Sequence, residues 1–194
     1  MRKLLIALIL LLPTVAWSGD VEDLTAELEA AKKEGQFKAY EEAAKKGDIR
    51  AQIVLGYLYL NGEGVAKNYV QAIRWYRSAA SQGDVVAQFN LGNIYDRGRG
   101  VARDPSEAAG WFKKAARQGL PIAQYNLALM FYSGDGVIQD YLTAHMWANL
   151  ASSAGYQQGK DFRDSLTMVM TSHQIVKAQE MAKRCLTSKY KDCD

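Results

Sequence analysis

One skeleton of small, aromatic and amide residues returns every 36 residues along the middle of this 194-residue chain. The residues that keep this step are Gly47, Gly83, Gly119 and Gly155; Trp75, Trp111 and Trp147; Val65, Val101 and Val137; Ala72, Ala108 and Ala144; and Gln52, Gln88 and Gln124. A fixed period of roughly 20–50 residues is the sequence signature of a solenoid or related repeat array. The repeat therefore constrains the fold class more than any other feature of the chain.

The first repeat shows how each unit divides into two helices. Residues 48–60 carry apolar side chains on one side, and Gly62 and Gly64 then supply the left-handed backbone that often ends a helix. Asn68, with Asp104 and Asp140 at the same place in later repeats, is a good N-cap for the second helix. That helix carries a buried stripe with the spacing i, i+3, i+4, i+7 and i+8. Its members are Ala72, Trp75, Tyr76, Ala79 and Ala80.

The first 18 residues have the features of a secretory signal peptide. A basic start is followed by the nine-residue apolar run Leu4–Leu12, far shorter than the ~20 residues that a membrane-spanning helix needs. Pro13 ends the run, and Ala16 and Ser18 are the small residues expected before a cleavage site. We expect cleavage after Ser18, no integral membrane span afterwards, and export, most simply to the periplasm, with secretion left open.

The rest of the chain, 19–194, is predicted to form one solenoid domain. Residues 19–46 form an N-terminal capping pair of helices, 20–34 and 36–46, and the first of these carries the apolar stripe Val21, Leu24, Leu28 and Ala31. Three repeats follow at 47–82, 83–118 and 119–154. Residues 155–194 form C-terminal capping helices and a tail, and Thr171 and Gln174 have the spacing of a capping box.

The two cysteines, Cys185 and Cys193, both lie near the C-terminus. An even pair in an exported protein suggests a disulfide, which would stabilise the fold by roughly 2–3 kcal/mol on the chain-entropy model. The alternative is a redox-active dithiol. Seven residues separate the two cysteines, unlike the CxxC spacing of oxidoreductases, so the spacing favours a structural bond.

At residues 51–83 the pattern AQxxLGxLYxxGxGVxxNxxxAxxWYxxAAxQG resembles the SEL1-like repeat, a relative of the tetratricopeptide repeat. Residues 87–119 and 123–155 are similar to it as well, with Phe112 in place of Tyr76. The resemblance implies an all-α fold, a right-handed α-α superhelical solenoid, and a role in protein–protein interaction. Some members of the family carry a cysteine pair in each repeat, which this chain lacks.

Composition and motifs argue against an enzyme or a nucleic-acid-binding protein. Removing Arg2 and Lys3 with the leader lowers the net charge from +3 to +1, whereas nucleic-acid binding calls for a strong basic excess. The only histidines, His145 and His173, lie 28 residues apart without a ligand cluster. No nucleophile elbow, P-loop or HExxH motif is present. We expect no catalytic residue, no metal site and no cofactor.

Residues that vary between repeats on the first helix are the candidates for binding a partner. By analogy with tetratricopeptide repeats, the face opposite the second helix lines a concave groove, and each set has the spacing i, i+3, i+7 and i+10. The predicted groove residues are Arg50, Ile53, Tyr57, Leu60, Val86, Phe89, Asn93, Asp96, Ile122, Tyr125, Leu129 and Tyr132. Most are apolar or aromatic, which is typical of partner surfaces. The alternative is that curvature packs them against neighbouring first helices.

The sequence therefore predicts a non-enzymatic scaffold or adaptor of the bacterial cell envelope that binds a protein or peptide in its groove. Two alternatives stay open: a regulator or inhibitor of an envelope enzyme such as a cell-wall hydrolase, and a thiol–disulfide isomerase acting through Cys185 and Cys193. A basic set on the second helices, Arg74, Arg77, Lys113, Lys114 and Arg117, suits a solvated face better than an anionic ligand. The partner's identity and the oligomeric state do not follow from the sequence.

Overall fold

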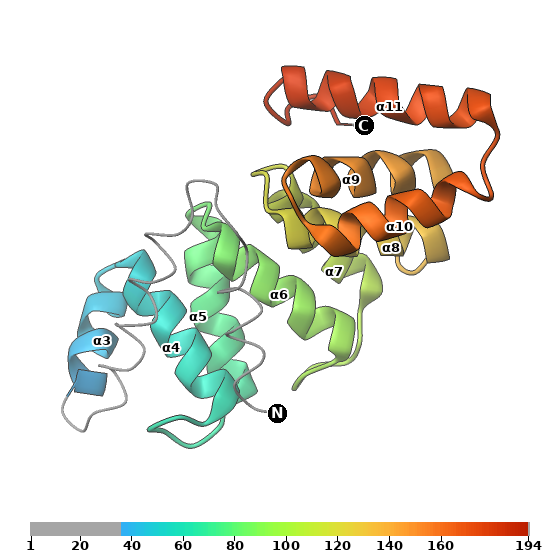
Figure 1. Cartoon of the computed structure of the whole chain (residues 1–194). Coiled ribbons are helices and arrows are strands. Elements are labelled where there is room, and N and C mark those ends of the chain that lie inside the picture. Colours follow the sequence, from blue (N-terminus) through green and yellow to red (C-terminus); the bar gives the residue numbers. More distant parts are fainter. Residues whose placement is uncertain (1–35, 194) are drawn as a thin grey trace. The chain divides into compact units, whose positions relative to one another are not determined.

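The computed structural model describes residues 36–193, and this part of the chain consists of helices joined by short turns (Figure 1). The helices are α3 (Gln36–Lys45), α4 (Ile49–Asn61), α5 (Tyr69–Ser81), α6 (Val85–Arg97), α7 (Pro105–Ala116), α8 (Pro121–Ser133), α9 (Tyr141–Ser153), α10 (Gln157–Thr167) and α11 (Ser172–Thr187). No strand occurs between residues 36 and 193. The predicted all-α fold is confirmed. The predicted signal peptide and the predicted helix 20–34 lie outside the described residues.

The chain divides into two compact units, Met1–Ala87 and Gln88–Asp194. Within the described residues, the first unit contains α3, α4, α5 and the start of α6. The second contains the rest of α6 and α7 to α11. In the first unit α4 packs against α3 and α5, and in the second α8 packs against α7 and α9. Helix α9 also contacts α10 and α11, which follow the last repeat.

Helix ends form where the sequence predicts them. Gly62 and Gly134 have the left-handed backbone, with φ of 73° and 75°, and their N–H groups donate to the carbonyls of Leu58 and Met130. The second helices begin at the side-chain caps Asn68, Asp104 and Asp140, each of which accepts a bond from a free backbone N–H. Thr171 and Gln174 form the reciprocal capping box at the start of α11.

Within a repeat the two helices approach closely because a glycine faces an aromatic ring. A Cβ added at Gly56 would lie 2.8 Å from the ring of Tyr76, and one at Gly92 would lie 2.6 Å from Phe112. Real Cβ atoms essentially never come so close. In the third repeat the same two positions hold Ala128 and Ala148, so a larger residue at the glycine position accompanies a smaller one at the ring position.

A buried glutamine in each repeat ties it to neighbouring backbone and side chains. The Gln52 amide donates to the carbonyl of Ala44 at 3.1 Å, and its oxygen accepts a bond from Gln82 Nε2 at 2.9 Å. Gln88 Oε1 accepts the equivalent bond from Gln118 at 2.9 Å. These bonds compensate the burial of a polar amide, which would otherwise cost stability.

In the third repeat one half of this arrangement is missing. Gln124 Nε2 donates to the carbonyl of Ala116 at 3.2 Å, as Gln52 does to Ala44. Its Oε1, however, is buried and accepts no hydrogen bond. The position that holds Gln82 in the first repeat holds Ala154 in the third, so the donor is absent. A buried acceptor without a partner costs about 1–3 kcal/mol.

We expect Ala154→Gln to stabilise the protein by about 1 kcal/mol, because its amide would reach Gln124 Oε1. Ala154 has φ −84° and ψ 8°, almost the same backbone as Gln82 at −86° and 5°, so the substitution introduces no strain. Urea unfolding measures the change. Ala154→Met is the control, since it adds similar length without a donor, and an equal gain from both variants would contradict the prediction.

Candidate binding surface

The predicted groove residues differ widely in exposure. Ile53, Phe89 and Ile122 are buried. Tyr57, Leu60, Val86, Asn93, Asp96, Tyr125 and Leu129 are half-buried, whereas Arg50 and Tyr132 are exposed. The Phe89 ring packs 5.8 Å from that of Phe112, on the second helix of its own repeat. Spacing alone suggested that such residues need not be buried within their own repeat, but for Phe89 the close approach at Gly92 brings Phe112 within reach.

Polar residues of the predicted set bond within their own unit. The Tyr57 hydroxyl donates to Glu63 Oε1 at 2.8 Å, and Asn93 Nδ2 donates to the carbonyl of Phe89 at 3.2 Å. Asp96 pairs at 3.5 Å with Arg103, which also forms an ion pair with Asp135. Tyr57 and Asp96 thus bond to the loops that follow their helices, whereas Asn93 bonds within α6.

An aromatic cluster in the second unit includes two of the predicted residues. We use this name for Tyr125, Tyr132, Tyr141, Tyr156 and Phe162. Ring centroids are 5.5 Å apart for Tyr156 and Tyr125, 6.0 Å for Tyr125 and Phe162, 5.6 Å for Phe162 and Tyr132, and 5.5 Å for Tyr132 and Tyr141. All four separations fall in the range at which aromatic pairs attract each other.

The aromatic cluster leads from the core to the surface. Tyr156 is buried, and burial raises the pKa of its hydroxyl above the ordinary value, with a smaller contribution from Tyr125. Tyr125 and Phe162 are half-buried. Tyr132 and Tyr141 retain 41% and 39% of their surface exposed. The rings of Tyr132 and Tyr141 are therefore already packed against each other, and Tyr132 also packs against Phe162. They would lose little side-chain freedom on binding.

The loop between α8 and α9 extends this exposed apolar surface. Gln139 holds the loop, because its amide donates to the carbonyl of Tyr132 at 2.7 Å and lies 3.4 Å from the Tyr141 hydroxyl. The preceding residue, Ile138, is 90% exposed. The other two repeats have alanine at this position, Ala66 and Ala102. The third repeat therefore exposes a large apolar side chain that the repeat fold does not require.

Sequence reasoning found Tyr125 and Tyr132 but missed the residues that join them. Phe162 lies on α10, outside the repeats, where its spacing marks it only as a core residue. Tyr141 follows the cap Asp140, at a position held by Tyr69 and Pro105 in the other repeats. Only the high density of aromatic residues between 125 and 162 could have indicated this cluster, because the spacing of residues does not predict that α10 packs against α8.

The C-terminal tail is bonded back onto α11 by the disulfide between Cys185 and Cys193. Both cysteines are buried. The Tyr190 N–H donates to the carbonyl of Cys185 at 2.8 Å, and a Cβ at Gly119 would lie 3.3 Å from the Tyr190 ring. Thiol–disulfide exchange requires access of an attacking thiolate to a sulfur. The burial of this disulfide therefore favours a structural role over the isomerase alternative.

Two general features of the described residues bear on function. Between residues 36 and 193, no three residues of the types that bind metals gather in a position to hold an ion. Over the same residues, no helix combines the length and apolar character needed to cross a bilayer.

One member of the basic set on the second helices makes a cation–π contact at the surface. Lys114 Nζ lies 3.8 Å from the centroid of the Trp111 ring.

Comparison with known proteins defines the class of this fold. Similar crystal structures include two that share more than 30% sequence identity with the chain. The first, a Sel1 repeat protein from Oxalobacter formigenes, is 37% identical with a TM-score of 0.62, covering 67% of this chain and 98% of that one. The second is a protective antigen of uropathogenic Escherichia coli with an SLR fold, 31% identical with a TM-score of 0.57; the match covers 79% of this chain and 42% of the antigen. The fold is an all-α solenoid.

The Sel1 repeat itself matches residues 49–84, 85–120 and 121–156. The chain therefore belongs to the Sel1-repeat family, whose members are generally protein-interaction scaffolds rather than catalysts. The matched repeats have the predicted length of 36 residues and begin two residues later than the predicted boundaries. No curated protein sequence matches the chain.

His145 is the one buried histidine of the described residues. It lies on α9, which contacts α8, α10 and α11, and neither ring nitrogen has a hydrogen-bond partner. Burial lowers the pKa of His145 below its ordinary value of 6.5, and the positive charge of Arg163 lowers it further, whereas Asp164 acts in the opposite direction. Arg163 itself donates to Ser152 Oγ at 3.0 Å and bonds Asp164.

We expect acid to destabilise the second unit through His145. The folded state favours the neutral ring, so the stabilisation is complete above about pH 6.5 and decreases as the pH falls through the lowered folded pKa. His145→Phe should therefore flatten the decline in the free energy of unfolding between about pH 7 and pH 5. Urea unfolding at each pH, followed by far-ultraviolet circular dichroism, provides the measurement.

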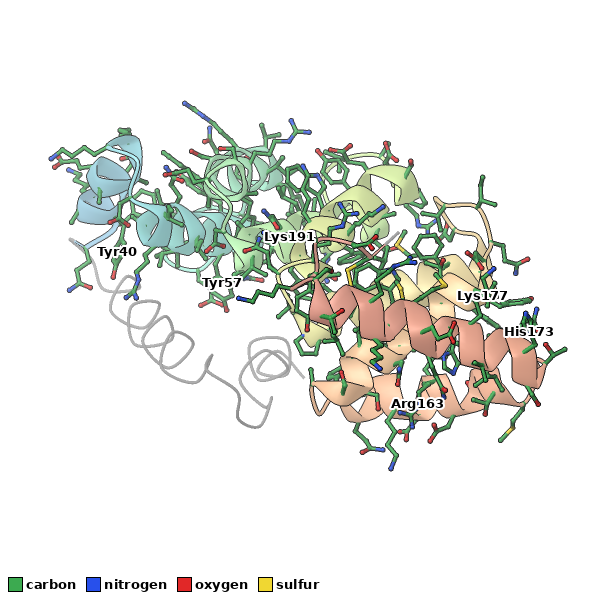
Figure 2. The ribbon with its side chains drawn as sticks, turned by 90° about the horizontal axis from the view of Figure 1, so that it is seen from above. Tyr40, Tyr57, Arg163, His173, Lys177 and Lys191 are labelled. Carbon is green, nitrogen blue, oxygen red and sulfur yellow. A yellow bond between two sulfur atoms is a disulfide. The ribbon has the colours of Figure 1, made fainter. Side chains whose placement is uncertain are left out.

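The control is His173, whose side chain is exposed on α11 (Figure 2). His173→Phe should keep the wild-type pH profile. If His145→Phe and wild type lose stability in parallel as the pH falls, His145 is not the group responsible.

Proposed function

We propose that this protein binds a protein or peptide partner through the exposed end of the aromatic cluster, Tyr132 and Tyr141 with the neighbouring Ile138. The observation that carries the proposal is the exposure of these three large apolar side chains on adjoining elements of one repeat. Tyrosine is enriched among the residues that dominate binding energy at interfaces. It adds apolar area and a polar hydroxyl at little conformational cost.

The variation between repeats supports this choice of surface. Where the third repeat has Tyr132, the first two have Leu60 and Asp96, and where it has Ile138 they have alanine. Asp96 is engaged with Arg103, and the side chains of Phe89 and Ile122 are buried. The part of the predicted groove best able to contact a partner is therefore the Tyr125–Leu129–Tyr132 face of α8, extended by Phe162 from α10.

We infer that the protein works outside the cytoplasm, in the cell envelope or beyond it. The disulfide between Cys185 and Cys193 supports this, because such bonds persist in oxidising compartments and are rare in the cytosol. The features of residues 1–18, a basic start, an apolar run and a small-residue cleavage site, agree with the same inference.

A partner-capture experiment tests the surface. The full-length gene carrying Tyr132→Glu and Tyr141→Glu is compared with wild type by in-cell crosslinking and mass spectrometry. We expect the variant to lose at least tenfold of the specifically crosslinked partner, since truncating an interface hot spot costs about 2 kcal/mol or more. Circular dichroism confirms that both proteins are folded.

Val70→Glu and Met168→Glu serve as matched controls, because both residues are also large, apolar and exposed. They should retain the partner at the wild-type level. Undiminished capture by the tyrosine variant, or equal loss in the controls, would reject this surface. Phe89→Glu is unsuitable as a test because it would place a charge in the core.

A further inference from the structure

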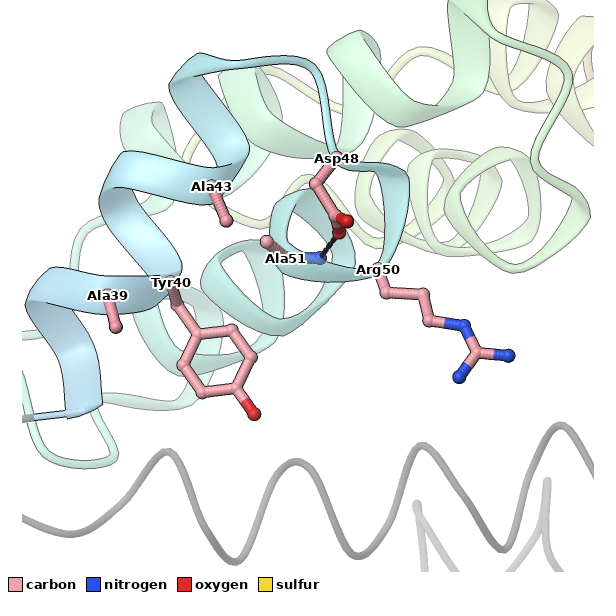
Figure 3. Close-up of a pocket in the computed structure, with 6 residues that line it drawn as sticks. All are labelled: Ala39, Tyr40, Ala43, Asp48, Arg50 and Ala51. Atoms are coloured by element: carbon pink, nitrogen blue, oxygen red, sulfur yellow. Dashed lines mark hydrogen bonds between the residues drawn. The ribbon is translucent and has the colours of Figure 1, made fainter.

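The aromatic cluster is supported by residues of its own unit. A hollow of about 300 Å³ lies between α3 and the start of α4, but it belongs to the first unit (Figure 3). The Asp48 carboxylate in that hollow is already engaged, because it accepts a bond from the Ala51 N–H at 2.7 Å. The exposed tyrosines of the second unit instead depend on α10, the helix that follows the last repeat.

Helix α10 supplies one ring to the proposed binding surface. The Phe162 ring stands perpendicular to the rings of Tyr132 and Tyr125, at interplanar angles of 90° and 89°. Edge-to-face pairs of this kind attract each other by about 0.5–1.5 kcal/mol beyond the area that they bury. The orientation of the exposed Tyr132 ring therefore depends in part on where α10 lies.

A close backbone approach holds α10 on α9. A Cβ added at Gly159 would lie 2.7 Å from the Cβ of Ala151 and 3.1 Å from the backbone nitrogen of Ser152. A side chain at this position would force the two helices apart. Three residues further along α10, Phe162 contacts α8 instead. The separation of α10 from α9 thus sets how far Phe162 reaches toward α8.

Arg163 adds polar contacts between the same two helices. Its Nη1 donates to Ser152 Oγ at 3.0 Å and to Asn149 Oδ1 at 3.4 Å, both on α9. Its Nε and Nη2 donate to Asp164 Oδ1 at 2.9 Å and 2.6 Å. Because Arg163 directly follows Phe162, the bonds that hold the guanidinium also hold the backbone that carries the ring.

His145 lies on the same face of α9 as the two acceptors of Arg163. His145, Asn149 and Ser152 have the spacing i, i+4 and i+7, which places them along one side of a helix. His145 is buried, and neither of its ring nitrogens has a hydrogen-bond partner. A proton on His145 would therefore put a second positive charge beside Arg163 without a bond to compensate it.

The helices that pack on α9 carry few charges that could offset this one. Helix α8 has no charged residue, and its titratable groups are tyrosines of the aromatic cluster. On α10, Asp164 already bonds Arg163, while Lys160 and Asp161 are exposed. The titratable residues of α11 are all exposed: His173, Lys177, Glu180, Lys183 and Arg184. The charges that act on His145 are therefore those of Arg163 and, in the opposite direction, Asp164.

We propose that Arg163 is a positioning residue for the binding surface, and that protonation of His145 beside it weakens partner binding by releasing α10. The inference rests on the proposed function, because it concerns regulation of the same surface. With His145 neutral, Arg163 and Gly159 keep α10 on α9, and Phe162 supports Tyr132. When His145 takes up a proton, the new charge repels Arg163 and favours a state in which α10 moves away and water reaches the imidazole.

Fluorine NMR of the full chain tests the position of the ring at residue 132. 4-Fluorophenylalanine replaces Tyr132, because this probe does not titrate. Arg163→Met should move the resonance toward that of Phe162→Leu, which lacks the perpendicular ring. Lys160→Met is the matched control, since it removes a positive charge from an exposed position of α10, and it should keep the wild-type resonance. An Arg163 variant with the wild-type resonance would overturn the positioning role.

Lowering the pH tests the part of His145 without any change at Arg163. As the pH falls from about 7 to about 5, the same resonance should move in the direction that Arg163→Met produces. His145→Phe should abolish this movement, and His173→Phe should leave it unchanged. A resonance that stays in place, or one that still moves in His145→Phe, would overturn the regulatory role.

In-cell crosslinking separates this proposal from the proposed function. Arg163→Met should lower partner capture about two- to tenfold, the range expected from losing one aromatic contact. Lys160→Met should retain the wild-type level. Full capture by Arg163→Met, together with loss in the Tyr132→Glu, Tyr141→Glu variant, would overturn the role of Arg163 and leave the proposed function intact. Undiminished capture by the tyrosine variant would reject the proposed function itself, and with it the effect of Arg163 on binding.

Discussion

The close approach of the two helices in a repeat is the contact on which the remaining packing depends. At Gly56 and Gly92 a hydrogen atom stands where any side chain would collide with the ring of Tyr76 or Phe112. Each such ring buries on the order of 150–250 Å² once the helices meet. A helix pair cannot bury its apolar face alone, so this contact also sets the surface that the next repeat covers. In the third repeat the same contact is made by Ala128 and Ala148. The residue on the first helix is larger than glycine, and the residue on the second helix is smaller than tyrosine or phenylalanine.

The constraints of packing leave little of the repeat free for function. Glycines, capping residues and buried glutamines recur because the helices need them. What the third repeat adds, Tyr132 and Ile138, serves no such need and lies at the surface beside the exposed Tyr141. The aromatic cluster connects these residues to buried Tyr156 through Tyr125 and Phe162. Partly exposed aromatic residues that are packed on a helical scaffold suit the proposed binding surface.

Periodicity predicted the fold well because it reports local requirements. The caps at Asn68, Asp104 and Asp140, the left-handed Gly62 and the Thr171–Gln174 box depend on neighbours within a few residues, and all are present. The binding face was harder to predict from the sequence, because the burial of a side chain depends on contacts between helices that residue spacing does not encode. Phe89 shares its spacing with Tyr125, yet it packs on Phe112 while Tyr125 meets Phe162. The sequence likewise did not indicate that both ring nitrogens of His145 are buried without a hydrogen-bond partner.

The buried glutamines also bear on how a chain of this kind changes length. Gln52 bonds backwards to Ala44, and Gln124 bonds backwards to Ala116, over the same eight residues. The first and the third repeat thus each donate the same amide to the helix before them, although that helix is α3 in one case and α7 in the other. Excising or duplicating a block of 36 residues would therefore rejoin an equivalent amide donor and carbonyl acceptor at this contact. Because these hydrogen bonds follow the 36-residue period, an array can lengthen or shorten by whole repeats while the terminal helices keep their own sequences.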